Sequence, residues 1–242
     1  MTDAYVIDAG NSRVKIGQFS QGELTAVHSF PKEASAQLYN FLNHCSCDKV
    51  IISSVSISEK SLADAIPDNI SVLVLDSDVN LPMTLAYETR GTLGKDRIAA
   101  VAGAVGLCKG STCMVVDAGS CVTIDQVDND QHWVGGNISP GLNMRWKAMH
   151  HYTERLPLAD QRSVTREMWG VSTLSALGNG GMWGLIREIE GYFEQVRSEY
   201  SSAKMVLTGG DAPVLAEFMK TKIFVEPNLV LIGLHEILQH NV

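Results

Sequence analysis

Two copies of one short pattern limit what this chain can fold into. Residues 6–10 (Val-Ile-Asp-Ala-Gly) recur as residues 115–119 (Val-Val-Asp-Ala-Gly), and each copy is followed by a small polar residue and a second apolar segment. A pattern that restarts in the second half of a chain indicates an internal duplication. We therefore expect two related α/β halves, residues 1–110 and 111–242, that meet at the turn-forming residues 108–112.

Apolar runs rich in β-branched residues predict strands, and apolar residues at helical spacing predict helices. Strands are expected at residues 5–7, 14–19, 49–55, 72–75, 113–116, 204–207 and 223–226, with one more starting near Val122. Helices are expected at residues 33–44, 58–66, 96–107, 185–197 and 229–240. This alternation of strands and helices is typical of α/β domains.

The composition fits a folded protein that acts on small molecules. Hydrophobic residues make up 45% of the chain and charged residues 19%, which is ordinary for a globular domain. The net charge of −8 argues against nucleic acid as a partner, because such a partner needs a basic face. No apolar stretch is long enough to cross a bilayer and no leader precedes the first strand, so we expect a cytoplasmic protein without a membrane partner.

The turn after the first strand of each half suits the binding of phosphate. Glycine at position 10 or 119 lets the backbone approach a ligand closely, and the N–H groups of such a turn can donate to phosphate oxygens. Asp8 and Asp117 can hold a hard cation through a carboxylate oxygen or through its bound water. Side-chain donors in the two turns are Asn11, Ser12 and Ser120, and a third glycine-rich turn comprises residues 209–211.

Each turn taken alone is as consistent with a plain hairpin as with a nucleotide site. Three such turns in order, each after an apolar strand, favour a nucleotide site. The sequence has neither the G-x-x-x-x-G-K-[ST] motif of P-loop proteins nor a G-x-G-x-x-G turn after a strand. Lys15 alternates with apolar neighbours, so it is either a phosphate ligand or a solvent-facing side chain.

Residues 94–97 (Gly-Lys-Asp-Arg) are the candidates for catalysis and substrate binding. Phosphoryl transfer to a hydroxyl needs a carboxylate that receives the hydroxyl proton, and Asp96 at the start of a predicted helix can take that role. The same position also suits a carboxylate that only caps the helix. Arg97 can bind an anionic group of a substrate through two hydrogen bonds.

Four motifs together carry a family resemblance. Residues 8–17 read Asp-Ala-Gly-Asn-Ser-Arg-Val-Lys-Ile-Gly, residues 94–97 read Gly-Lys-Asp-Arg, residues 117–120 read Asp-Ala-Gly-Ser, and residues 135–141 read Gly-Gly-Asn-Ile-Ser-Pro-Gly. They resemble the D-x-G-N-T-x-x-K-x-G, G-x-D-R, D-x-G-T and G-G-x-I-x-P-G motifs of type III pantothenate kinases. The resemblance extends over nearly the whole chain.

This resemblance implies an actin-like (ribonuclease H-like) fold with a nucleotide cleft between the two halves. It implies that ATP phosphorylates the primary hydroxyl of pantothenate to give 4′-phosphopantothenate, the first step of coenzyme A synthesis. It also implies that the enzyme uses Mg²⁺ and a monovalent cation, K⁺ or NH₄⁺, and forms a homodimer.

The resemblance assigns a role to each matching residue. Asp96 would be the general base, Asp117 would bind the monovalent cation, and Asp8 would hold Mg²⁺ through water. The residues expected to bind ATP are Asp8, Gly10, Asn11, Ser12, Lys15 and Ser120. The residues expected to bind pantothenate are Tyr87, Gly94, Lys95, Asp96 and Arg97, together with Thr173 from the partner subunit.

Two other functions stay open on the sequence. An actin-like kinase of another small hydroxy acid or sugar would share the phosphate turns, although such enzymes are usually longer. A non-catalytic regulatory protein of the same fold would not need the reactive residues. The presence of Asp8, Asp96, Arg97 and Asp117 argues against this last alternative.

Overall fold

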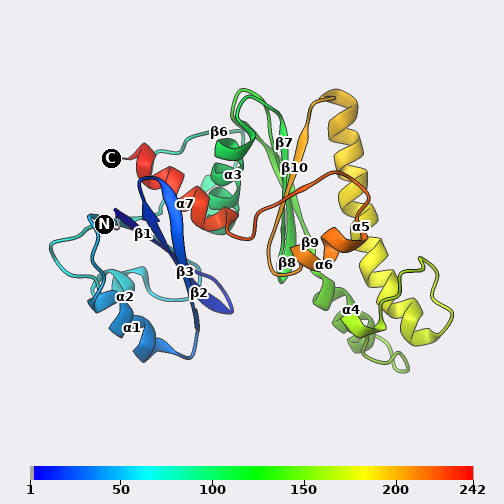
Figure 1. The fold of residues 1–242 in the computed structure, drawn as a ribbon. Helices are drawn as coiled ribbons and strands as arrows, with labels where there is room; N and C mark the ends of the chain where they lie inside the picture. Colours follow the sequence, from blue (N-terminus) through cyan, green and yellow to red (C-terminus); the bar gives the residue numbers. More distant parts are fainter. Residues whose placement is uncertain (1–2, 242) are drawn as a thin grey trace. The chain divides into compact units, whose positions relative to one another are not determined.

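The structure, a computed structural model, describes residues 3–241 and consists of two compact units. The first unit runs to Leu107 and also includes the segment from Asn228 onward, whereas the second unit spans Cys108–Pro227. Both units combine β-strands with α-helices (Figure 1). The α/β class expected from the sequence is therefore confirmed.

The first unit is built on a five-stranded mixed sheet. It contains β1 (Ala4–Ala9), β2 (Arg13–Ser20), β3 (Glu23–Pro31), β4 (Lys49–Ser54) and β5 (Ser71–Val74), in the order β3-β2-β1-β4-β5. Strand β1 pairs antiparallel with β2 and parallel with β4, and it lies at the centre of the sheet. It forms there because residues 4–7 are apolar and buried on both faces.

Helices of the first unit cover both faces of this sheet. On one face, Ile7, Ile16 and Ile52 share a hydrophobic core with α1 (Ser35–Asn43) and α2 (Glu59–Ala63). On the other face, α7 (Leu229–His240) packs against β1, β2 and β4. The short elements β6 (Thr84–Leu85) and η1 (Arg90–Thr92) precede α3 (Lys95–Cys108). The helices predicted at residues 33–44, 96–107 and 229–240 are confirmed within a few residues.

The second unit repeats the strand order of the first. Its strands are β7 (Cys113–Ala118), β8 (Cys121–Val127), β9 (His132–Pro140), β10 (Lys204–Thr208) and β11 (Phe224–Val225), and within this unit they lie in the order β9-β8-β7-β10-β11. Strand β8 is antiparallel to β7 and β9, whereas β10 runs parallel to β7 and β11. The duplication predicted from the repeated motif is thus visible in the topology of the two sheets.

Helix α5 (Thr173–Glu199) forms the core of the second unit with β7. Leu185, Ile186 and Ile189 of this helix share a hydrophobic core with Met114 and Val116. The other helices of the unit are α4 (Leu142–His151), η2 (Gln161–Ser163) and α6 (Ala212–Phe218). Within residues 3–241, no helix combines the length and the apolar character that a membrane span requires.

The prediction of a helix at residues 185–197 covers only the second half of α5. Its first half is rich in glycine, which disfavours an isolated helix, so no helix was predicted there. Two of these glycines make close contacts, since a Cβ atom on Gly178 would lie 2.4 Å from the Ser163 oxygen and one on Gly181 would lie 2.3 Å from Trp146 Nε1. Tertiary packing therefore stabilises this half of the helix.

Helices α3 and α7 cross each other through two glycines. A Cβ atom on Gly233 would lie 1.7 Å from the carbonyl oxygen of Ala99, and one on Gly103 would lie 2.5 Å from the oxygen of Leu229. Only glycine lets two helix backbones approach so closely. The segment from Asn228 onward is therefore packed in the first unit, whereas the sequence interpretation assigned it to the C-terminal half. The domain boundary at residue 110 stays a prediction.

His235 of α7 packs its ring flat against Phe19 of β2. The two ring centroids are 4.0 Å apart with an interplanar angle of 3°, and only 6% of the His235 surface is exposed. Burial lowers the pKa of His235 below its ordinary value, and this effect outweighs the opposite effect of the Glu236 and Asp3 carboxylates. The imidazole is therefore neutral in the folded protein at neutral pH.

We expect the free energy of unfolding to decrease as the pH falls below about 6.5. The unfolded chain takes up a proton on His235 in this range, whereas the folded chain resists protonation until the pH reaches its lowered pKa. Urea unfolding of wild type and His235→Phe at pH 7.5 and 5.5 measures this effect, because phenylalanine keeps the ring contact but does not titrate. An equal pH dependence in the two proteins would contradict the assignment to His235.

Candidate active site

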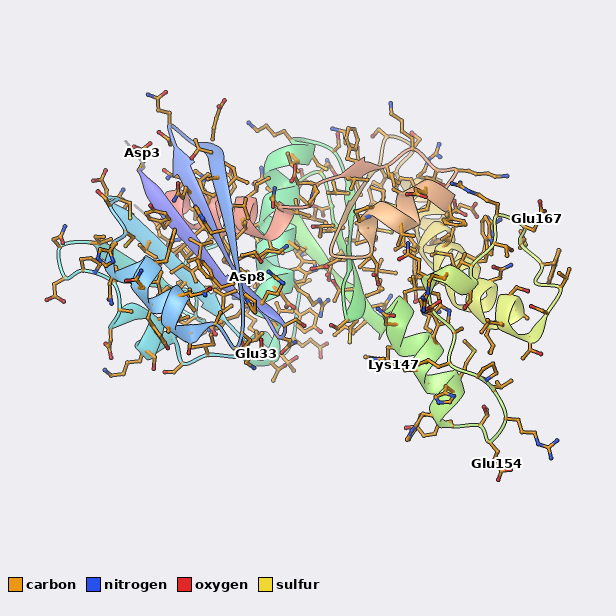
Figure 2. The ribbon with its side chains drawn as sticks, turned by 60° about the horizontal axis from the view of Figure 1, so that its bottom comes forward. Asp3, Asp8, Glu33, Lys147, Glu154 and Glu167 are labelled. Atoms are coloured by element: carbon orange, nitrogen blue, oxygen red, sulfur yellow. The ribbon has the colours of Figure 1, made fainter. Side chains whose placement is uncertain are left out.

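Asp8 lies toward the carboxyl end of β1, in the hairpin that β1 forms with β2. In this hairpin Asp8 is opposite Lys15, and on its other side it neighbours Ser53 of β4. Figure 2 shows Asp8 near one end of the strand and Asp3 just before the other. Because side chains alternate along a strand, Asp8 lies on the same face of the sheet as Val6, which is the face that α7 covers.

The turn of this hairpin is narrow, and its polar residues are accessible. The N–H of Gly10 donates to the oxygen of Arg13 at 3.0 Å, and Asn11 and Ser12 between them are exposed. The hydroxyl of Ser56, which follows β4, donates to the Gly10 oxygen at 2.7 Å. The turn is thus fixed from the neighbouring strand while its donors stay open to solvent, as a phosphate loop requires.

Asp117 has the corresponding position in the second unit. It lies toward the carboxyl end of β7 and neighbours Thr208, the last residue of β10. The N–H of Gly119 closes the hairpin turn by donating to the oxygen of Cys121 at 3.0 Å, and Ser120 between them is exposed. The two units therefore present the same arrangement, with a carboxylate at the end of the strand and an accessible small polar residue in the turn.

The motif at residues 135–141 ends against this second turn. A Cβ atom on Gly141 would lie 2.3 Å from the Gly119 oxygen and 2.5 Å from the Ser120 oxygen. The N–H of Gly141 donates to that Ser120 oxygen at 3.2 Å. Glycine is therefore required at position 141, because any side chain there would displace the turn.

The third turn, residues 209–211, packs on Asp117. Gly209 has a φ angle of +94°, which favours glycine, and a Cβ atom there would lie 2.5 Å from Asp117 Oδ1. The N–H of Asp211 donates to the Ala118 oxygen at 2.9 Å. Burial raises the pKa of the Asp211 carboxyl. A second carboxyl group thus lies next to the strand that carries Asp117.

Asp96 is exposed in the first turn of α3. Its Oδ1 atom accepts the backbone N–H of Arg97 at 2.8 Å, and a Cβ atom on Gly94 would lie 2.5 Å from the same oxygen. Gly94 therefore makes room for the carboxylate. The bond to Arg97 agrees with a structural role at the helix terminus, and the exposure of Asp96 leaves it accessible to a substrate.

Arg97 and Tyr87, both predicted to bind pantothenate, are in contact. Arg97 is only 4% exposed, its Nη1 donates to the Tyr87 hydroxyl at 3.3 Å, and its Cζ lies 5.4 Å from the centre of the Tyr87 ring. Lys95, the third predicted ligand, forms an ion pair with Glu59 of α2. The structure thus places one buried guanidinium and one exposed carboxylate at the start of α3.

Thr173 begins α5 in the second unit and is exposed. The preceding residue, Ser172, caps the helix, because its hydroxyl oxygen accepts the N–H of Ser175 at 3.2 Å. Thr173 therefore lies on a different element from Asp117 and Ser120, the other predicted site residues of this unit.

The carboxylates of Asp8 and Asp117 suit a cation that phosphate oxygens also coordinate. In the part of the chain from residue 3 to 241, no group of three or more His, Cys, Asp and Glu side chains is arranged to hold a metal ion. Asp8 and Asp117 are two separate carboxylates, and each can offer a hard oxygen ligand by itself. Mg²⁺ commonly takes one or two carboxylates and completes its coordination with water and substrate phosphates, so the donor set suits it.

Comparison with known proteins decides the family. A sequence model of the type III pantothenate kinases matches residues 5–195, which include the Asp8 and Asp117 turns and the motif at residues 94–97. The chain belongs to the type III pantothenate kinases. A type III pantothenate kinase of Porphyromonas gingivalis is 36% identical over 241 residues, which is 98% of each chain. Another, of Cytophaga hutchinsonii, is 37% identical over 240 residues, which is 98% of this chain and 99% of that one.

Solved structures show the same fold at lower identity. A Campylobacter jejuni protein assigned to the Baf family of transcriptional activators has a TM-score of 0.67 and 23% identity, with 98% of both chains covered. A Sinorhizobium meliloti protein assigned as a 2-dehydro-3-deoxygalactonokinase has a TM-score of 0.61 and 11% identity, again with 98% of both covered. These similarities concern the fold, and they confirm the actin-like class that is typical of type III pantothenate kinases.

Two residues that support the site were missed by sequence reasoning. Ser56 fixes the Gly10 turn, and Glu59 pairs with Lys95. Ser56 lies between β4 and α2 and Glu59 is the first residue of α2, and both are far from their partners in sequence. No local pattern marks such partners, so nothing in a single sequence of a type III pantothenate kinase could have identified them.

Proposed function

We propose that the chain transfers the γ-phosphoryl group of ATP to the primary hydroxyl of pantothenate, forming 4′-phosphopantothenate and ADP, as the first step of coenzyme A synthesis. The observation that carries this proposal is the exposed Asp96 carboxylate next to the buried Arg97 and its half-buried partner Tyr87, in a member of this family. The Asp96 carboxylate can receive a proton, and the Arg97 guanidinium can bind a carboxylate. A hydroxy acid such as pantothenate has both a hydroxyl group, which can give up a proton, and a carboxylate, which a guanidinium can bind.

In this proposal Asp96 is the general base. It receives the proton of the hydroxyl while the hydroxyl oxygen forms a bond to the γ-phosphorus of ATP and the bond to the bridging oxygen of ADP breaks. Arg97 and Tyr87 hold the pantothenate carboxylate, and Gly94 and Lys95 border the same substrate. Such positioning supplies much of the rate enhancement in phosphoryl transfer.

The two Asp-Ala-Gly turns bind the nucleotide and its cations in this proposal. The residues assigned to ATP are Asp8, Gly10, Asn11, Ser12, Lys15 and Ser120. Asp8 holds Mg²⁺ through water, and Asp117 binds K⁺ or NH₄⁺. When bound, the cations neutralise charge on the phosphates. Thr208 and Gly209, which lie against Asp117, keep that carboxylate in place.

We expect ADP release to require pantothenate together with K⁺ or NH₄⁺. A coupled assay with Mg-ATP and pantothenate, run in K⁺, NH₄⁺ or Na⁺ salts at equal ionic strength, measures this dependence. The expected result is turnover in K⁺ or NH₄⁺ and little in Na⁺. No pantothenate-dependent ADP release in any salt would refute the proposed substrate, and equal rates in all three salts would refute the cation role of Asp117.

We also propose a homodimer, in which Thr173 of one subunit reaches the pantothenate of the other. Exposed apolar side chains of the second unit support this, since Val171 is 99% exposed and Trp169 82% in the loop before Thr173, and Tyr152 is 83% exposed after α4. The loop that carries Trp169 is fixed, because Asn179 Nδ2 donates to Thr165 Oγ1 at 2.8 Å and to the Glu167 oxygen at 2.7 Å. Figure 2 labels Glu167, which belongs to this loop.

We expect Val171→Asp to weaken the dimer by at least about tenfold, because a carboxylate would be buried there without a partner. Sedimentation equilibrium at several protein concentrations measures the association. The matched control is Val27→Asp, which changes an exposed valine of β3 in the other unit. A monomeric wild type, or equal association of wild type and Val171→Asp, would contradict the proposed interface.

We place this enzyme in the cytoplasm, which agrees with its five free cysteines.

A further inference from the structure

A pocket lies in the second unit, at the end of β10 that is remote from Asp117. Its volume is about 290 Å³, and it lies between the C-terminal part of α5, the turn before β10 and the start of β11. Lys204 at the start of β10 lines it, whereas Thr208 at the other end of the strand is the neighbour of Asp117. Four residues of a strand span about 13 Å, so this pocket is distinct from the phosphate turn.

The charged side chains that line this pocket are all basic. They are Arg197, Lys204 and Lys222, and no acidic residue lines the pocket, although the whole chain has a net charge of −8. A carboxylate behind the pocket, that of Glu190, is already bound, because it accepts Arg187 Nη1 at 2.7 Å and the Thr221 hydroxyl at 3.1 Å. The pocket therefore favours an anion.

The rest of the lining suits phosphate together with a flat apolar group. Ser201 and Ser202 supply hydroxyl groups, whereas the Thr221 hydroxyl already donates to Glu190. Phe224 is 51% exposed at the pocket, and its open ring face is costly to leave in water. Phe193 forms the buried side, with the guanidinium carbon of Arg197 at 5.9 Å from its ring centre. A ligand with a phosphate and a flat ring is complementary to this lining, because the phosphate can bind the basic side chains and the ring can stack on Phe224.

We propose that this pocket binds a nucleoside monophosphate, with the phosphate between Arg197, Lys204 and Lys222 and the base against Phe224. Its volume is at the lower limit of small-molecule sites, which suits a mononucleotide. Lys204 is half-buried and its Nζ donates to the Cys108 oxygen at 3.5 Å, so one of the cations is positioned in advance. The site is independent of the proposed kinase activity.

Calorimetric titration of AMP into the protein, saturated beforehand with a non-hydrolysable ATP analogue and Mg²⁺, tests this site. We expect one further binding event per chain. Lys222→Glu and Arg197→Glu should each weaken it about tenfold or more, because each reverses a charge that contacts phosphate. Lys220→Glu is the matched control, since Lys220 is exposed nearby but does not line the pocket, and it should change the affinity less than twofold.

Further measurements keep the outcomes distinct. Inorganic phosphate should bind at least about tenfold more weakly than AMP, and Phe224→Ala should reduce the affinity for AMP but not for phosphate. Thermal unfolding of each variant shows that it is folded, which is expected because Arg197, Lys222 and Phe224 are exposed. The absence of a second event, equal binding of phosphate and AMP, or equal effects of Lys220→Glu and Lys222→Glu would each overturn the proposal.

Discussion

We expect Asp96→Asn to lower kcat by about 10²–10⁴-fold in pantothenate-dependent turnover, the range for the loss of a general base, the role proposed for Asp96. Asparagine has the same shape and keeps an oxygen that can accept the N–H of Arg97, so the start of α3 stays intact. What is lost is the ability to receive the hydroxyl proton. The KM for ATP should change little, because the proposed nucleotide ligands lie on other elements.

Steady-state kinetics and urea unfolding of the same samples separate catalysis from stability. The matched control is Asp64→Asn, which removes an exposed carboxylate that pairs with Lys60 on the surface and should leave kcat unchanged. If Asp96→Asn retains kcat within about threefold of wild type, Asp96 is not the base. If it loses stability as well as activity, the helix-capping role dominates.

Gly233→Ala destabilises the protein by about 3 kcal/mol, the upper part of the usual range for overpacking. The added methyl group would lie 1.7 Å from the Ala99 oxygen and 2.7 Å from the backbone nitrogen of Gly103. Both neighbours are backbone atoms, so no side-chain rotation can relieve the clash. The helices must therefore separate, and the apolar surface between them opens to water.

The control for this change is Gly106→Ala on α3, the other helix of the crossing. A Cβ atom there meets only the Glu236 side chain at 3.5 Å, an ordinary contact. Because alanine favours a helix over glycine by roughly 0.5–1 kcal/mol, this variant should be as stable as wild type or slightly more stable. Equal urea midpoints for wild type and Gly233→Ala would show that the crossing of α3 and α7 is not close in solution.

The strands at the centre of each sheet were predictable because they are buried on both sides. β1 and β7 are continuous apolar runs, and the repeated Asp-Ala-Gly pattern that follows them marks the start of each unit. β3 and β9 were not predicted. In β3 exposed and half-buried residues alternate, and its pairing depends on the register with β2 rather than on its own composition.

The local parts of the candidate site were predictable for a related reason. A hairpin turn such as residues 8–15 contains its own geometric requirements, so a short motif is enough to find it. The Tyr87 contact with Arg97 needed the family resemblance, since no spacing rule joins them. The glycine-rich turn at residues 209–211 was found in the sequence, but the contact of Gly209 with Asp117 is recognised only when β7 and β10 are placed side by side.

The packing of α7 on the first sheet has a consequence for synthesis on the ribosome. This helix covers β1, β2 and β4, yet it is made only after the whole second unit, Cys108–Pro227. At roughly 5–20 residues per second, that delay is on the order of ten seconds. During this interval one face of the nascent first sheet lacks its helix and exposes apolar surface that chaperones can bind. The unit that begins first in the sequence therefore finishes folding last.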